Sequence, residues 1–119
     1  MVGQNAHFAN GLTAIYIACG QDVAQVVNAS IGIVSLDLNE DGDLYVAAKL
    51  PNLIVGTVGG GTSLPTQQEC LRIMDCLGKG KANKFAEIIA GTILAGEISI
   101  YAALASGNFI DAHIKKRTA

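Results

Sequence analysis

A glycine-rich stretch, Gly56-Thr57-Val58-Gly59-Gly60-Gly61-Thr62, most constrains what this chain can fold into. It lies between an apolar run that ends at Val55 and a helix-start pattern at 63–65. Glycines allow positive φ and close approach to a ligand, and a helix start offers unpaired N–H groups. The stretch is therefore interpreted as either an anion-binding loop or a tight structural turn. The phosphate loop of the NTPases needs a lysine where this chain has Thr62. The stretch also lacks the dinucleotide fingerprint G-x-G-x-x-G.

The composition is that of one globular domain with few charges. Half of the 119 residues are hydrophobic and 15% are charged, which leaves apolar surface for another chain or another part of the same protein. The net charge of −2 argues against a nucleic-acid partner. Three cysteines without a Cys-x-x-Cys pair disfavour zinc and a disulfide framework and favour a cytoplasmic location. Glu87 and Glu97 interrupt the longest apolar segment, so we expect no membrane span.

Hydrophobic periodicity predicts an α+β fold in which helices flank a small antiparallel sheet. The segment from about Ala82 to Ser106 is apolar almost all round, so we expect one long buried helix there. A final helical stretch is expected around 110–114. The other expected elements are a helix over 6–19 stopped by Gly20, a short helix after Asp22, strands over 30–38 and 44–50, an extended piece over 52–58, and a helix from Pro65 to Gly78.

Several single residues have a structural interpretation that needs no function. Asp22 is a good helix N-cap, and His7 taken alone is interpreted as an interior histidine whose ring nitrogens are satisfied. Glu97, in an apolar helix, must be paired or hydrogen-bonded if it is buried. The turn over 37–43 imitates half of a calcium loop, but Ala48 stands where that loop needs glutamate, so calcium is rejected.

Further motifs accompany the glycine-rich stretch in a fixed order. They are Asn5-Ala6-His7-Phe8-Ala9-Asn10, then Thr13 to Cys19 followed by Gly20-Gln21-Asp22-Val23-Ala24-Gln25, then Leu64-Pro65-Thr66-Gln67, then Ala95-Gly96-Glu97-Ile98-Ser99, and a late His113. Over nearly all of its length the chain resembles the C-terminal part of the catalytic domain of hydroxymethylglutaryl-coenzyme A (HMG-CoA) reductase. The resemblance implies a parent oxidoreductase that converts HMG-CoA to mevalonate and CoA with two NADPH or NADH, as a dimer-based homo-oligomer.

The resemblance also implies roles for individual residues. Asp22 corresponds to the catalytic aspartate, and Asn10 to an asparagine that helps to hold the hydroxymethylglutaryl group. His113, which by itself would be a surface histidine, corresponds to the residue that protonates the departing CoA thiolate. Ala112 stands where the family often has serine. The cofactor-binding residues would be Gly56, Thr57, Val58, Gly59, Gly60, Gly61 and Thr62, and no metal is implied.

Three parts of the family's machinery have no counterpart in this sequence. They are the catalytic glutamate, the catalytic lysine and a second cofactor motif. We therefore expect residues 1–119 to be the C-terminal segment of the large catalytic domain and to be inactive alone, with the cofactor domain and the upstream motifs lying elsewhere. Two other hypotheses stay open: a non-catalytic domain that binds nucleotides through the glycine-rich stretch, and an interaction domain that docks through its apolar surface.

Overall fold

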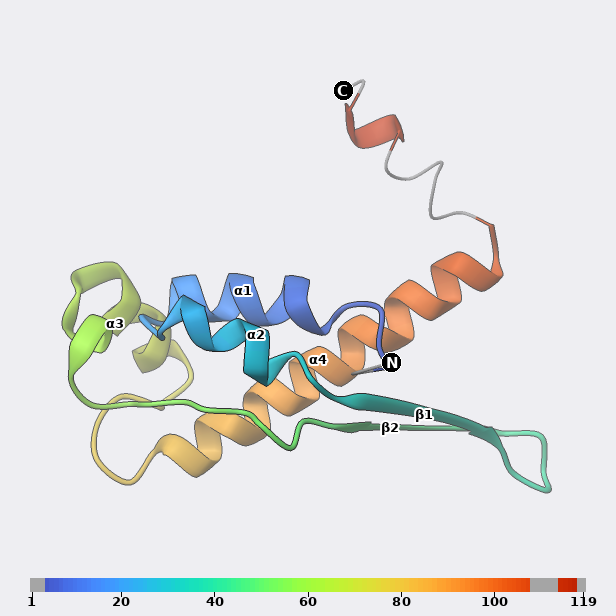
Figure 1. Cartoon of the computed structure of the whole chain (residues 1–119), viewed down its shortest axis with the longest axis horizontal. Helices are drawn as coiled ribbons and strands as arrows, with labels where there is room; N and C mark the ends of the chain where they lie inside the picture. The colour runs from blue at the N-terminus through green and yellow to red at the C-terminus, as the bar shows by residue number, and fades with distance from the viewer. Residues whose placement is uncertain (1–3, 108–113, 118–119) are drawn as a thin grey trace.

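The computed structural model describes residues 4–107 and 114–117 and confirms the α+β class. Figure 1 shows α1 beside α4, α3 near one end of this pair, and the β-hairpin extending toward the other end. In chain order the elements are α1 (Phe8–Ala18), the 3-10 helix η1 (Val23–Gln25), α2 (Val26–Ala29), β1 (Ile33–Leu38), β2 (Leu44–Lys49), the 3-10 helix η2 (Gly60–Ser63), α3 (Pro65–Ile73) and α4 (Ala82–Ala105).

The core forms where one face of α1 packs against one face of α4. Both helices bury apolar side chains at intervals of four residues, the spacing that places side chains on one face of a helix. The buried positions are Phe8, Leu12 and Tyr16 on α1 and Phe85, Ile89 and Ile93 on α4. Ala29, Leu71 and Cys76 close the core from the neighbouring elements. Each large apolar side chain buried here contributes about 1.5–3 kcal/mol.

The long helix α4 is confirmed, but the expectation that it is buried all round is wrong. Only the row that ends at Ile93 and Glu97 is buried, while Ile98 and Leu104 are about half exposed. The reason is that α1 and β2 cover one side of the helix and leave the other side open. By length and composition α4 could also cross a membrane, a test that core helices of soluble proteins pass as well.

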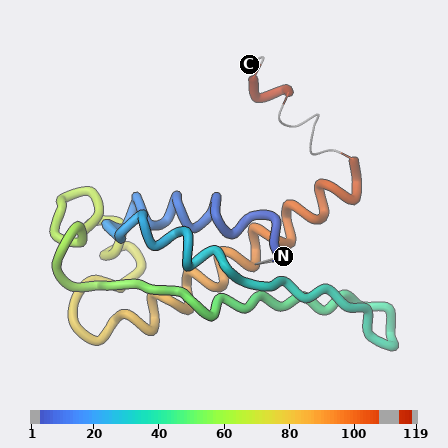
Figure 2. Tube along the Cα trace, viewed as in Figure 1, coloured from blue at the N-terminus to red at the C-terminus, as the bar shows by residue number. Residues whose placement is uncertain are grey.

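The predicted hairpin is confirmed, with its first strand beginning at Ile33. The strands pair antiparallel from Ile33↔Lys49 to Leu38↔Leu44. The amide oxygen of Asn39 accepts a hydrogen bond from the N–H of Asp43 at 2.7 Å and closes the turn. After β2 the chain makes no further strand pairing before η2. The trace in Figure 2 shows it running back from the hairpin. This path carries the glycine-rich stretch to the C-terminal end of α1.

Helix α3 ends earlier than the sequence predicts, at Ile73 instead of Gly78. Asp75 adopts a left-handed conformation with φ of 53°, and the N–H of Cys76 donates to the carbonyl of Leu71 at 2.8 Å. This hydrogen bond is the signature of a Schellman C-cap, in which glycine usually takes the left-handed position. Because aspartate occupies that position here, composition alone did not reveal the end of the helix.

Candidate functional site

The turn after α1 places Asp22. Gly20 has φ of 68°, and the N–H of Gln21 donates to the carbonyl of Tyr16 at 2.9 Å, so α1 stops at the predicted glycine. The carboxylate of Asp22 then accepts a hydrogen bond from the N–H of Ala24 at 3.0 Å and caps η1. The predicted capping role of Asp22 is confirmed. Its side chain is exposed, so the cap also holds a carboxylate at the protein surface.

This turn lies directly against the glycine-rich stretch. A Cβ atom added to Gly61 would lie 2.7 Å from the carbonyl oxygen of Gly20, and a Cβ on Gly20 would collide with the backbone of Gly61 and Thr62. Real Cβ atoms essentially never come so close to backbone atoms. The two segments therefore meet backbone to backbone, at a separation that only glycine permits.

The side chain of Gln21 joins the same two segments by hydrogen bonds. Its amide nitrogen donates to the carbonyl of Gly56 at 2.9 Å, and its amide oxygen accepts from the N–H of Gly56 at 2.8 Å. The amide nitrogen also donates to the carbonyl of Cys19 at 2.9 Å. The sequence pattern included Gln21 in a motif but gave it no role. No local signal reveals these bonds, because their partner lies 35 residues away.

The glycine-rich stretch turns back on itself at its centre. Gly59 and Gly60 have φ of 74° and 55°, and Thr62 donates to the carbonyl of Gly59 through both its hydroxyl group, at 2.6 Å, and its N–H, at 3.2 Å. Within residues 4–107, the N–H groups of Gly59, Gly60 and Gly61 have no hydrogen-bond acceptor. Three adjacent N–H donors without Cβ atoms form a surface suited to an anion.

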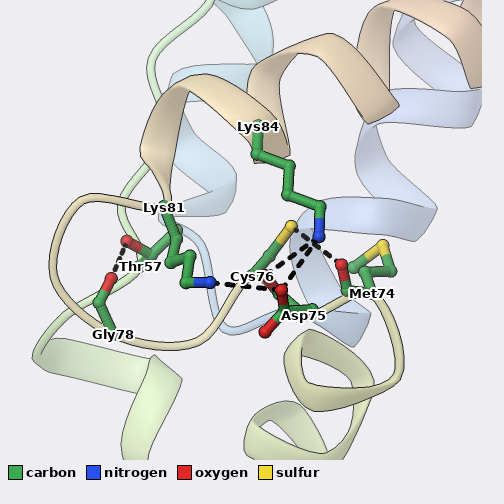
Figure 3. A network of polar contacts seen from close by, with 7 residues as sticks. All are labelled: Thr57, Met74, Asp75, Cys76, Gly78, Lys81 and Lys84. Carbon is green, nitrogen blue, oxygen red and sulfur yellow. Dashed lines mark hydrogen bonds and ion pairs between the residues drawn. The ribbon is translucent and has the colours of Figure 1, made fainter.

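A second connection joins the glycine-rich stretch to the segment after α3. The hydroxyl group of Thr57 donates to the carbonyl of Gly78 at 2.7 Å, and the N–H of Gly78 donates to the carbonyl of Thr57 at 2.9 Å. Figure 3 shows this pair beside the ion pairs of Asp75 with Lys84 at 3.1 Å and Lys81 at 3.2 Å. The hydrogen bond from Lys84, followed by that from Lys81, lowers the pKa of Asp75.

Tyr16 and Cys19, at the end of α1, belong to the apolar core. The hydroxyl group of Tyr16 donates to the carbonyl of Ile54 at 2.6 Å, shortly before the loop begins. Burial raises the pKa of Tyr16. Burial, followed by the neighbouring Cys70 and Cys76, raises the pKa of the Cys19 thiol to about 11, so this thiol stays protonated at neutral pH. Among the described residues, no group of three or more His, Cys, Asp or Glu side chains could hold a metal ion.

The structure does not bring the predicted substrate residue Asn10 into contact with Asp22. Asn10 is exposed near the start of α1, whereas Cys19 caps the other end. At 1.5 Å per residue these two positions are about 13 Å apart along the helix axis. His113 lies outside the described residues, so its relation to the other predicted site residues stays a prediction.

His7 sits in a notch between two helices. A Cβ on Gly11 would lie 2.6 Å from its ring, and a Cβ on Gly96 would collide with the ring. The buried ring nitrogen Nδ1 has no hydrogen-bond partner within the described part of the chain, so the expectation of a satisfied interior histidine is wrong. Glu97 behaves as predicted for a buried carboxylate, because it accepts hydrogen bonds from the N–H groups of Ala6 and His7.

Comparison with known proteins identifies the family. The family model for hydroxymethylglutaryl-coenzyme A reductase matches residues 1–118. The chain belongs to the HMG-CoA reductase family. It is 49% identical over 112 residues to the 3-hydroxy-3-methylglutaryl-coenzyme A reductase of Methanocaldococcus jannaschii, a match that covers 94% of the chain and 27% of that relative. For the reductase of Aeropyrum pernix the identity is 50% over 114 residues, or 92% of the chain and 27% of the relative.

The chain therefore spans little more than a quarter of the curated HMG-CoA reductases that it matches. The chain is also 49% identical to the corresponding enzyme of Pyrococcus horikoshii, and this match covers 93% of the chain and 28% of that relative. These relatives come from archaea and are named as reductases, which confirms the family that the ordered motifs indicated. The family assignment covers the helix turn with Asp22 and the glycine-rich loop together, since the matched region contains both.

Proposed function

We propose that the complete protein reduces HMG-CoA to mevalonate and free CoA with two molecules of NADPH or NADH. The observation that carries this proposal is the backbone contact between Gly20 and Gly61, reinforced by the bonds of Gln21 to Gly56. It sets the turn that carries Asp22 against a loop with free N–H donors. A reductase needs its acid–base residues and its cofactor-binding residues side by side.

Each predicted site residue of this chain would have its own role in the reaction. The loop from Gly56 to Thr62 would bind the dinucleotide phosphates through the free N–H groups at its centre. The bound nicotinamide supplies the hydride. Asp22 is oriented by its cap hydrogen bond. It would hold a glutamate and a lysine, both supplied from elsewhere in the enzyme, in a shared hydrogen-bond network. Asn10 would bind the hydroxymethylglutaryl group, and His113 would protonate the thiolate as the C–S bond of the thioester breaks.

An assay of the complete protein tests this function. HMG-CoA with either nicotinamide cofactor should give mevalonate and free CoA, with two cofactor molecules oxidised for each mevalonate formed. The assay also measures the preference between NADPH and NADH. Absence of mevalonate with both cofactors would refute the proposal. Residues 1–119 tested alone should give no turnover, because the glutamate and lysine motifs are absent from this sequence.

We also propose that these residues form the C-terminal segment of the large catalytic domain, in a cytoplasmic homo-oligomer based on dimers. Two features of the surface support the association. A cavity of about 260 Å³ between the hairpin and α4 is lined by Leu36, Leu44, Val46, Ile98, Tyr101, Ala102 and Ala105. Leu38 and Tyr45 are more than 60% exposed. Such apolar surface favours contact with another chain.

Light scattering of the 119-residue chain at micromolar concentration tests the association. The expected result is a dimer or larger species whose specific contact buries roughly 1,000 Å² or more in total. A monomer under these conditions would contradict self-association through this surface. It would leave the rest of the catalytic domain as the partner that covers the hairpin.

A further inference from the structure

The side chain of Gln21 joins two segments through three hydrogen bonds. Its amide nitrogen contacts the carbonyls of Cys19 and Gly56, both at 2.9 Å, while its amide oxygen accepts from the N–H of Gly56. The carboxamide thus pairs with both backbone groups of Gly56, as a neighbouring strand would. The next residue in the chain is Asp22, whose own side chain caps η1. The side chain of Gln21 therefore connects Gly56 to the turn that carries Asp22.

The loop is held at three places, and Gln21 provides the first. Gly56 is held by Gln21, Thr57 by Gly78, and Gly61 by its backbone contact with Gly20. The peptide groups between these places carry the free N–H donors. Removal of the Gln21 bonds would leave Gly56 without its only side-chain partner in the described structure. The start of the loop could then move relative to the turn.

We propose that Gln21 is a positioning residue that keeps the glycine-rich stretch correctly placed relative to the carboxylate of Asp22. This inference rests on the proposed reductase function. It assigns Gln21 no contact with substrate, and the effect operates through Gly56 and Asp22. A displacement of about 1 Å at a reacting centre costs about a hundredfold in rate. Loss of the Gln21 bonds should therefore raise the KM for the nicotinamide cofactor and lower kcat together, while the KM for HMG-CoA changes little.

Neither methionine nor glutamate can reproduce the three hydrogen bonds of Gln21. Methionine has a similar length but cannot form the hydrogen bonds. Glutamate keeps an acceptor for the N–H of Gly56 but turns a negative oxygen toward two carbonyl groups, where glutamine places its amide nitrogen. Gln21→Met removes the connection without adding charge, and Gln21→Glu makes it repulsive. Gln68, on α3, has no side-chain hydrogen bond within residues 4–107, so Gln68→Met is the matched control.

The test uses the complete protein with two readouts, cofactor kinetics and hydrogen–deuterium exchange of the peptide covering 53–64. With Gln21→Met we expect about a tenfold or greater rise in the KM for NAD(P)H, a fall in kcat and faster exchange in the loop. Gln68→Met should change none of these. Cofactor kinetics and loop exchange equal to those of the control would overturn the proposal, as would a loss of kcat with an unchanged cofactor KM.

The two readouts also separate this inference from the proposed function. If the wild-type protein forms no mevalonate, the reductase assignment fails, and exchange of the loop still decides whether Gln21 holds it. Thermal unfolding of each variant checks that the fold persists. If Gln21→Glu does not fold, the comparison of Gln21→Met with Gln68→Met carries the test alone.

Discussion

The carboxylate of Glu97 accepts a hydrogen bond from the backbone N–H of His7 at 2.6 Å, across 90 residues of sequence. The same carboxylate accepts a second bond, from the N–H of Ala6 at 3.2 Å. Glu97 is fully buried, so these bonds replace the water that a charged group needs. They also place a negative charge at the N-terminus of α1, where the helix dipole favours it. A residue in the middle of α4 thus caps the first helix.

Glu97→Gln should lower the free energy of unfolding by about 1.5–3 kcal/mol. The substitution keeps the shape of the side chain but replaces one acceptor oxygen with an NH₂ group that faces an N–H donor. Chemical denaturation measures the loss. Glu87→Gln, an exposed change on the same helix, should stay within about 0.5 kcal/mol of the wild type. Equal effects of the two substitutions would contradict the capping role of Glu97.

Two glycines of α4 should respond to alanine in opposite directions. At Gly96 the new Cβ would collide with the ring of His7, and overpacking of this kind costs about 1–3 kcal/mol. At Gly91 the Cβ would meet open space, so Gly91→Ala should stabilise the protein by up to about 1 kcal/mol through helix propensity alone. Thermal unfolding of both variants compares them directly. Stabilisation by Gly96→Ala would show that His7 moves aside without cost.

Asp22→Asn should separate the cap from the catalytic role in the complete protein. Asparagine caps helices as well as aspartate does, so the melting temperature should change little. Turnover should nevertheless fall by about a hundredfold or more, because the variant removes a preorganised charge. Steady-state kinetics and thermal unfolding provide the two measurements, with Asp41→Asn in the exposed hairpin turn as the control. Near-normal turnover would leave Asp22 with its capping role alone.

Asp75 should make stability depend on pH in the acid range. Its folded-state pKa is lowered by Lys84 and Lys81, so the ion pairs stabilise the protein above the unfolded pKa of 3.8. That contribution is lost as the pH falls through the lower, folded-state pKa. Asp75→Asn removes the charge but keeps a residue that tolerates positive φ. Wild type and variant should therefore differ in urea midpoint at pH 7 and converge toward pH 2. A constant difference over that range would exclude the ion pairs as its source.

The sequence predicted the elements well and their contacts poorly. The helix stop at Gly20 and the hairpin turn follow from local residue chemistry, which acts within a few positions. The motif order also pointed to the family and to Asp22. In contrast, the end of α3 was missed because Asp75, rather than glycine, takes the left-handed position. Long-range contacts leave no periodic signal, so neither the pairing of Gln21 with Gly56 nor the notch around His7 could be predicted.

The packing of α1 against α4 has a consequence for the order in which this segment can fold. The hairpin joins residues that are close in the chain and can form early, but the core joins α1 to α4. Contacts between residues so distant in sequence form slowly, because the loop between them must be closed first. During synthesis, α2 and α3 can contact α1 early, but the face of α1 that packs on α4 stays uncovered by it until α4 has left the ribosome. We expect nascent chains that end before Glu97 to be bound by chaperones and released once α4 is complete.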